Sequence, residues 1–147
     1  MSNSLIRPCP ACGSKNRIPA RHLADTGRCG RCHAALPPLA APFEADSVVF
    51  DEVVGAATVP VLVDFWAAWC GPCRAAAPHV AKVAETMAGR ALVLKVDTDK
   101  HPELAARFNV SGIPNFVVLK HGRVVSQQAG LVSGQVMQQW LEQAAAA

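Results

Sequence analysis

The sequence lacks the long apolar segments that membrane proteins need. No run within its 147 residues approaches the ~18–20 apolar residues of a membrane-spanning helix. Its first residues also lack a basic stretch followed by an apolar one, so they do not resemble a secretory signal. We therefore expect a cytoplasmic protein with no membrane partner. In a reducing cytoplasm, paired cysteines indicate metal binding or catalysis rather than structural disulfides.

Acidic residues are scarce in the first part of the chain. Residues 1–42 hold six of the 14 Lys and Arg residues but only one of the 11 Asp and Glu residues. Such a basic segment can indicate nucleic-acid binding. Metal-bound thiolates in the same segment would offset part of its charge, however, so we expect no nucleic-acid partner. The sequence gives no sign of an oligomer, and we expect a monomer.

The six cysteines form three Cys-x-x-Cys pairs, of which the first two lie close together. Two short chelating loops joined by a longer one let four sulfurs converge on one tetrahedral ion. Few apolar residues surround them, so metal binding would have to supply the folding free energy of this segment. We expect one structural Zn²⁺ and no organic cofactor. The expected ligands are Cys9, Cys12, Cys29 and Cys32.

Other interpretations of this four-cysteine segment exist. Iron could occupy the same site, and oxidation could convert the pairs into two disulfides. Residues 29–33 (CGRCH) also match the attachment pattern of c-type haem. That interpretation would require an exported protein and would leave Cys9 and Cys12 without a role. Zinc is therefore the favoured prediction.

A Pro- and Ala-rich stretch over residues 34–42 is typical of a linker. We predict a zinc-binding domain over residues 1–33 and a second domain over residues 43–147. In the second domain, helices are expected over 46–56 and 73–87, from 102, and after a Ser133 cap. Strands are expected over 59–66, 91–96, 116–119 and 123–125. This order predicts an α/β fold with helices flanking a mixed sheet, parallel at first and closed by an antiparallel hairpin.

The third pair, Cys70 and Cys73, lies where a buried strand passes into a helix. Pro72 suits the first helical turn, which puts Cys70 at the helix N-terminus. Free N–H groups and the helix dipole favour a thiolate there, and only the thiolate attacks a disulfide. Cys73 lies within disulfide reach and can resolve the mixed disulfide. The alternatives are half of a zinc site, which the other four cysteines already complete, or a structural disulfide, which a reducing cytoplasm disfavours.

Residues 63–73 (VDFWAAWCGPC) resemble the active-site signature of the thioredoxin family, and residues 112–115 (GIPN) resemble its cis-proline loop. The likeness runs from about Phe43 to the C-terminus and implies a thioredoxin fold with Cys70 and Cys73 as its redox centre. The Gly-Pro between the cysteines is similar to that of reducing members. With its four-cysteine segment, the chain resembles the zinc-carrying second thioredoxins of bacteria. That type is cytoplasmic and is reduced by thioredoxin reductase.

The resemblance also implies roles for single residues. Asp64 matches the buried acid that exchanges a proton with the resolving cysteine, and Lys95 matches its usual partner. A structural salt bridge is the alternative interpretation, and both can hold because burial raises a carboxyl pKa. Asn115 departs from the threonine that usually follows the cis-proline. The implied substrate-binding residues are Trp69, Gly71, Pro72, Gly112, Ile113, Pro114 and Gly130.

Together, these features predict a protein-disulfide reductase that acts on disulfide-containing client proteins. The alternative is a redox sensor or holdase-type binding module. In that case an oxidant such as peroxide would attack the zinc thiolates, release the metal and change partner binding.

Overall fold

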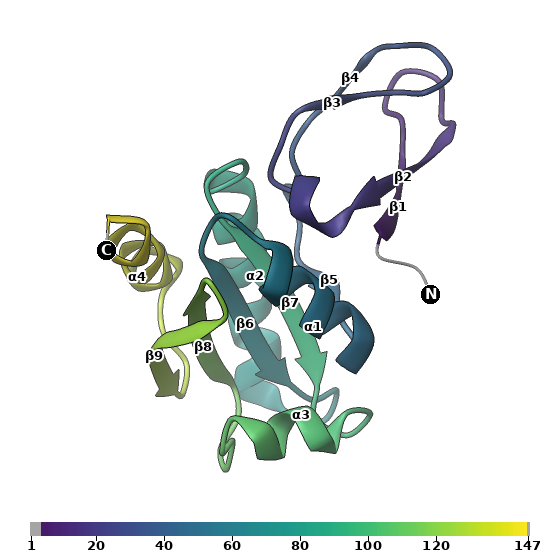
Figure 1. The fold of residues 1–147 in the computed structure, drawn as a ribbon. Helices are drawn as coiled ribbons and strands as arrows, with labels where there is room; N and C mark the ends of the chain where they lie inside the picture. The colour runs from purple at the N-terminus through teal and green to yellow at the C-terminus, as the bar shows by residue number, and fades with distance from the viewer. Residues whose placement is uncertain (1–3, 147) are drawn as a thin grey trace.

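The computed structural model describes residues 4–146 and shows a head of short strands beside a larger α/β body (Figure 1). The head spans residues 4–36 and the body residues 43–146. The outermost residues of the two predicted domains, 1–3 and 147, lie outside the described residues. No helix in the described part of the chain has the length and apolar character to cross a membrane.

The head consists of two antiparallel hairpins joined by a short 3-10 helix, η1 (Ala20–His22). In the first hairpin, β1 (Ser4–Pro8) pairs with β2 (Lys15–Pro19). In the second, β3 (Gly27–Arg28) pairs with β4 (Ala35–Leu36). Each hairpin turn carries one of the two N-terminal cysteine pairs.

Strand β4 lies inside the stretch predicted as a linker. Leu36 is buried and packs with Cys9 and Cys29, which explains why the chain stays with the head as far as this residue. The head thus extends to Leu36, inside the stretch predicted as a linker, because pairing with β3 is a tertiary feature that the Pro/Ala composition does not reveal. The division into two domains stays a prediction.

The body has the predicted order of helices and strands. Its helices are α1 (Ser47–Ala56), α2 (Gly71–Thr86), α3 (Pro102–Arg107) and α4 (Gly134–Ala146). Its longer strands are β6 (Val61–Trp66), β7 (Leu92–Asp97), β8 (Asn115–Lys120) and β9 (Arg123–Ala129). With the short β5 (Phe43–Glu44), the sheet order is β5-β7-β6-β8-β9. Strands β5, β7 and β6 pair in parallel, whereas β8 pairs antiparallel with both of its neighbours, β6 and β9.

Local signals account for several element boundaries. Asp46 caps α1, with its side chain accepting a hydrogen bond from the Val49 N–H at 2.9 Å. The Ser133 hydroxyl accepts one from the Val136 N–H at 3.3 Å at the start of α4. Both caps match the sequence prediction and satisfy N–H groups that the helix itself leaves free.

Two strands differ from the prediction. The pairing of β5 with β7 adds a fifth strand that is too short for any periodic pattern to reveal. Strand β9 runs to Ala129 rather than ending at residue 125. Its residues are mostly exposed at the sheet edge, and its second half is mainly polar. It therefore lacks the apolar alternation that marks a half-buried strand in a sequence.

Strand β6 is buried on both faces, as its continuous apolar run predicts. Val63 and Phe65 face a core shared with α1 and α3, whereas Leu62 faces a core shared with α2 and α4. Asp64 has the same parity as Leu62 and therefore lies on the α2 face of the sheet.

The head packs against the body through its own apolar residues. Ala20 and Leu23 belong to the same core as Phe50 and Val53 of α1, and the Leu39 N–H donates to the Leu23 carbonyl at 2.9 Å. Contact with the body therefore buries apolar residues of the head, which stabilises the head in addition to any bound metal. It lies at the end of the molecule opposite α3 (Figure 1).

This packing predicts that the head contributes to the stability of the whole chain. Leu23 has no exposed surface, so Leu23→Ala should lower the free energy of unfolding by about 2–5 kcal/mol. Leu131→Ala is the matched control, because 51% of Leu131 is exposed and its loss should cost about 0.5 kcal/mol or less. Urea unfolding of the full chain measures both, and equal effects would contradict the shared core.

Candidate functional site

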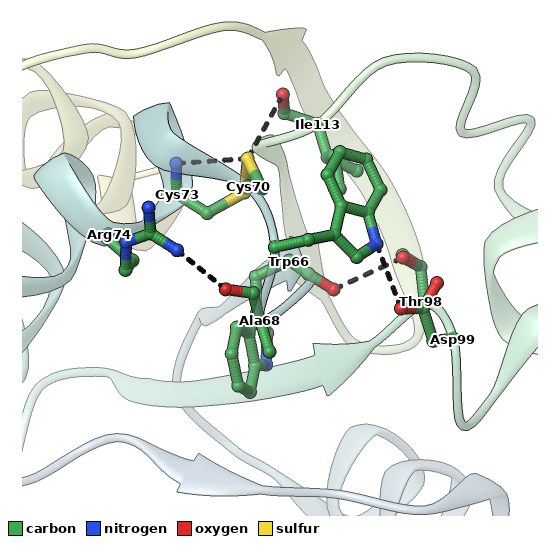
Figure 2. The surroundings of a disulfide bond; sticks show 9 residues. Trp66, Ala68, Cys70, Cys73, Arg74, Thr98, Asp99 and Ile113 are labelled. Atoms are coloured by element: carbon green, nitrogen blue, oxygen red, sulfur yellow. Dashed lines mark hydrogen bonds between the residues drawn. A yellow bond between two sulfur atoms is a disulfide. The ribbon is translucent and has the colours of Figure 1, made fainter.

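Cys70 and Cys73 form a disulfide at the start of α2 (Figure 2). Cys70 is the N-cap of the helix, and its Sγ accepts a hydrogen bond from the Cys73 N–H at 3.1 Å. Gly71 and Pro72 fill the first turn, which brings the two Cα atoms to 5.2 Å. The sulfur of Cys70 therefore lies among the free N–H groups at the positive end of the helix.

The two cysteines are buried to the same degree, with 3% of Cys70 and 4% of Cys73 exposed. Cys70 is the predicted nucleophile, but the exposed fractions do not separate the two cysteines in the disulfide form. What distinguishes them is position, because Cys70 caps the helix and contacts the opposite loop. Its Sγ lies 3.8 Å from the Ile113 carbonyl oxygen.

Trp69 is the largest exposed side chain beside the disulfide, with 67% of its surface accessible. Its Nε1 donates a hydrogen bond to Asp99 Oδ2 at 2.9 Å, which ties the indole to the turn that follows β7. On the other side, Arg74 donates to the Ala68 carbonyl at 2.8 Å. Asp99 is not among the predicted site residues, although its place just after β7 puts it at the same end of the sheet as Cys70.

The loop before β8 supplies the facing wall of the site. The Ile113–Pro114 peptide is cis, and the Gly130 N–H donates to the Pro114 carbonyl at 2.8 Å. Gly130 has φ +99°, a conformation that favours glycine. Three chain segments thus meet around the disulfide. They bring together all the predicted substrate-binding residues: Trp69, Gly71, Pro72, Gly112, Ile113, Pro114 and Gly130.

Asn115, which follows the cis-proline, is buried with 5% of its surface exposed. Its Oδ1 accepts a hydrogen bond from Gln127 Nε2 at 3.1 Å, and the same amide group donates to the Phe108 carbonyl at 2.8 Å. Gln127 of β9 therefore links Asn115 at the start of β8 to Phe108 at the end of α3. The Asn115 side chain is therefore bonded inside the fold and is not part of the exposed surface.

Asp64 on β6 is buried, with only 1% of the residue exposed, and its Oδ1 has no hydrogen-bond partner among the described residues. Burial raises the pKa of its carboxyl to about 7, against an opposing effect of Lys95 and a reinforcing effect of Glu44. A carboxyl that titrates near neutral pH can both accept and return a proton.

Lys95 pairs in register with Asp64 on the neighbouring strand, but the expected ion pair is not formed. Within residues 4–146, Asp64 and Lys95 are not joined by any ion pair within 4.0 Å. The Lys95 ammonium instead lies 4.5 Å from the centroid of the Trp66 ring. The aromatic face provides a cation site nearer to solvent than the buried carboxylate. Glu44, which the sequence analysis did not single out, accepts a hydrogen bond from Trp66 Nε1 at 3.2 Å.

The four head cysteines converge as predicted, with all Sγ atoms within 4.8 Å of one another. Cys9 Sγ lies 3.6 Å from Cys32 Sγ, and Cys12 Sγ lies 3.7 Å from Cys29 Sγ. A tetrahedral zinc with Zn–S bonds of about 2.3 Å separates its sulfurs by about 3.8 Å. The spacing of the sulfurs therefore fits one tetrahedral ion.

Backbone N–H groups converge on these sulfurs. The Ala11 N–H donates to Cys9 Sγ at 3.3 Å, and the Arg31 N–H donates to Cys29 Sγ at 3.4 Å. Hydrogen bonds from the Cys32 and Arg31 N–H groups lower the pKa of the Cys29 thiol to about 5. Such donors stabilise thiolates, the form that binds metal.

Two family models match the chain. The thioredoxin model matches residues 41–143, and a zinc-ribbon model described as "Thioredoxin 2, N-terminal" matches residues 8–34. The chain belongs to the thioredoxin family. Thioredoxins are protein-disulfide reductases, and the Cys70–Cys73 disulfide lies within the matched residues. The zinc-ribbon match and the convergent sulfurs together indicate metal binding by the head.

Relatives and solved structures agree with this assignment. Thioredoxin C-3 of Corynebacterium nephridii is 41% identical over 95% of this chain and 94% of its own length. Thioredoxin 1 of Nostoc sp. is 42% identical over 66% of this chain and 90% of its own length. The structure of a mutant thioredoxin from Halobacterium salinarum is 30% identical, with a TM-score of 0.68 over 73% of this chain and 93% of its own. The thioredoxin fold is thereby confirmed.

The raised pKa of Asp64 predicts a stability that depends on pH. Between 3.8 and about 7, the folded carboxyl binds a proton that the unfolded one has lost, so stability falls as pH rises through this window. Asp64→Asn should therefore be more stable than wild type at pH 8, by up to about 4 kcal/mol, and should lose this advantage near pH 4.

Urea unfolding of both proteins at pH 4 and pH 8 measures this difference. Glu85→Gln is the control, because 70% of the Glu85 side chain is exposed and the variant should follow wild type at both pH values. If the free energies of unfolding of Asp64→Asn and wild type differed by the same amount at pH 4 and pH 8, the raised pKa of Asp64 would be contradicted.

Proposed function

We propose that this thioredoxin reduces disulfides of cytoplasmic proteins, with Cys70 as the nucleophile and Cys73 as the resolving cysteine. The observation that carries the proposal is the position of Cys70 Sγ. This sulfur accepts a hydrogen bond from the Cys73 N–H at the start of α2 and lies 3.8 Å from the Ile113 carbonyl oxygen. Exposed residues form the surface around it, among them Trp69, Gly71 and Gly112. A client backbone can lie along that surface with its disulfide next to Cys70.

In the reduced enzyme, the Cys70 thiolate attacks one sulfur of the client disulfide. An S–S bond forms between Cys70 and the client, and the second client sulfur leaves as a thiolate. The N–H groups at the start of α2 stabilise the Cys70 thiolate before attack. Trp69 and the loop carrying Ile113 supply the apolar contacts that orient the client.

In the second step, Asp64 accepts the proton of Cys73. The resulting thiolate attacks Cys70 Sγ and releases the other client sulfur. The client then holds two reduced cysteines, and the enzyme holds the disulfide that the structure shows. A pKa of about 7 suits Asp64 to this role, because the carboxylate can take the proton near neutral pH and return it later.

A two-electron donor must then reduce the Cys70–Cys73 disulfide, and we propose thioredoxin reductase as that partner. The membership in the thioredoxin family and the Gly-Pro between the cysteines support this direction of electron flow. The chain works as an electron carrier between the reductase and disulfide-containing clients.

We further propose that the head binds one structural Zn²⁺ through Cys9, Cys12, Cys29 and Cys32. When bound, the ion supplies positive charge that lets the clustered sulfurs ionise together. Cys12 shows why this positive charge is needed. The Ser14 N–H lowers the pKa of the Cys12 thiol, but desolvation and the neighbouring cysteines raise it to about 12. The sulfur spacing supports a tetrahedral ion.

Reduction of insulin disulfides by dithiothreitol, followed as turbidity, tests the catalytic roles. Cys70→Ser should abolish the acceleration, because no thiolate remains at the helix start. Cys73→Ser should attack clients but fail to release them, so covalent client complexes should accumulate on non-reducing gels. Retained activity in Cys70→Ser would overturn the proposal.

Metal analysis of the purified chain tests the zinc proposal. Wild type and Cys70→Ser should each carry one zinc per chain, since Cys70 lies outside the head. Cys29→Ser should lose the ion, because Cys29 is a buried member of the four-sulfur cluster. Equal zinc contents in the Cys29 and Cys70 variants would contradict this ligand set.

A further inference from the structure

A row of charged side chains crosses the parallel part of the sheet next to the redox pair. Glu44 on β5 pairs in register with Lys95 on β7, and Lys95 pairs in register with Asp64 on β6. Side chains at paired positions of neighbouring strands point to the same face. Lys95 therefore lies between two acidic residues across the sheet, Asp64 inside the molecule and Glu44 at the sheet edge.

The surroundings of the two carboxyl groups differ. Asp64 is buried, and in the part of the chain that the structure describes its Oδ1 has no hydrogen-bond partner. Glu44 is exposed and accepts the Trp66 indole N–H at 3.2 Å. Pairing with Asp64 would require the ammonium to lose its water, whereas the outer position lets the lysine stem pack while its charge stays near solvent.

Trp66 links Glu44 to Lys95. Its Nε1 donates to Glu44, and its ring face holds the Lys95 ammonium at 4.5 Å from the centroid. Donation of the indole N–H to a carboxylate increases the electron density over the ring, which strengthens its attraction for a cation. Glu44 thus fixes the ring and also adds its own negative charge on the outer side of Lys95.

We propose that Glu44 is a positioning residue for the redox pair: it holds the Lys95 ammonium over Trp66 and away from Asp64, which leaves Asp64 free to exchange a proton with Cys73. The inference rests on the proton-transfer role proposed above for Asp64. An ammonium within about 4–6 Å of a carboxyl lowers its pKa by about 1–3 units and makes it a weaker base. The charged side chains that act on Asp64 are Lys95 from β7 and Glu44 from β5.

Glu44→Gln tests the inference, because it removes the charge and keeps an oxygen that can accept the Trp66 N–H. The Asp64 carboxyl is titrated by carbon-13 NMR in the disulfide form, where neither Cys70 nor Cys73 titrates. The midpoint should fall by about 1 pH unit, as Lys95 moves toward Asp64. Glu85→Gln, an equal charge change on an exposed part of α2, should leave the midpoint in place. An unchanged midpoint in Glu44→Gln overturns the inference.

The same substitution in a Lys95→Gln background identifies the route. If Glu44 acts by placing Lys95, most of the fall in the Asp64 midpoint should vanish in this background. A fall of equal size in both backgrounds would mean that Glu44 repels Asp64 directly, which would overturn the positioning role.

The pH profile of disulfide reduction separates this inference from the proposed function. In Glu44→Gln the profile should move to lower pH together with the Asp64 midpoint. A midpoint that moves under an unchanged profile supports the placement of Lys95 by Glu44 but overturns the catalytic role of Asp64. Loss of activity in Cys70→Ser depends on neither result and tests the enzyme itself.

Discussion

The burial of β6 on both faces is the constraint on which the rest of the structure depends. Its residues alternate between the two cores, so a shift of one residue would exchange the side chains that face each core and would move Asp64 away from the α2 face. The end of β6 is therefore held in place, and with it the turn that leads to Cys70. The same enclosure removes water from Asp64 and raises its pKa. One packing requirement thus positions the sulfur and prepares the acid beneath it.

The same Cys-x-x-Cys spacing serves two kinds of chemistry in this chain because the backbone around it differs. At the start of α2, the second cysteine lies one turn along the helix, its N–H points at Cys70 Sγ, and the two sulfurs bond. In the head, each pair lies in a hairpin turn whose N–H groups point at a sulfur, and two such turns face each other. The first arrangement brings two sulfurs together for exchange. The second brings four together around one centre.

The sheet edge affects the interior of the redox site. Strand β5 is two residues long, yet it places Glu44 beside Lys95 and within reach of Trp66. The polar row that results extends from solvent to the buried Asp64. Lys95, which the resemblance assigned to Asp64 as a partner, lies on the aromatic ring instead. The environment of a buried acid is therefore shaped by a residue that is itself exposed.

The sequence by itself determined the elements of the body, the caps at Asp46 and Ser133, the position of Cys70 at a helix start and the four-cysteine set. These are local features, because periodicity, capping residues and short cysteine spacings act over a few residues. Only the tertiary structure decided the pairing of β5, the full length of β9, the attachment of Leu23 to the body and the place of Lys95. Each of these depends on which distant segments meet: an edge strand shows no apolar alternation, and a lysine between two acids and a ring has no local preference. The sequence therefore located the chemistry, and the packing of distant segments set the surroundings in which that chemistry takes place.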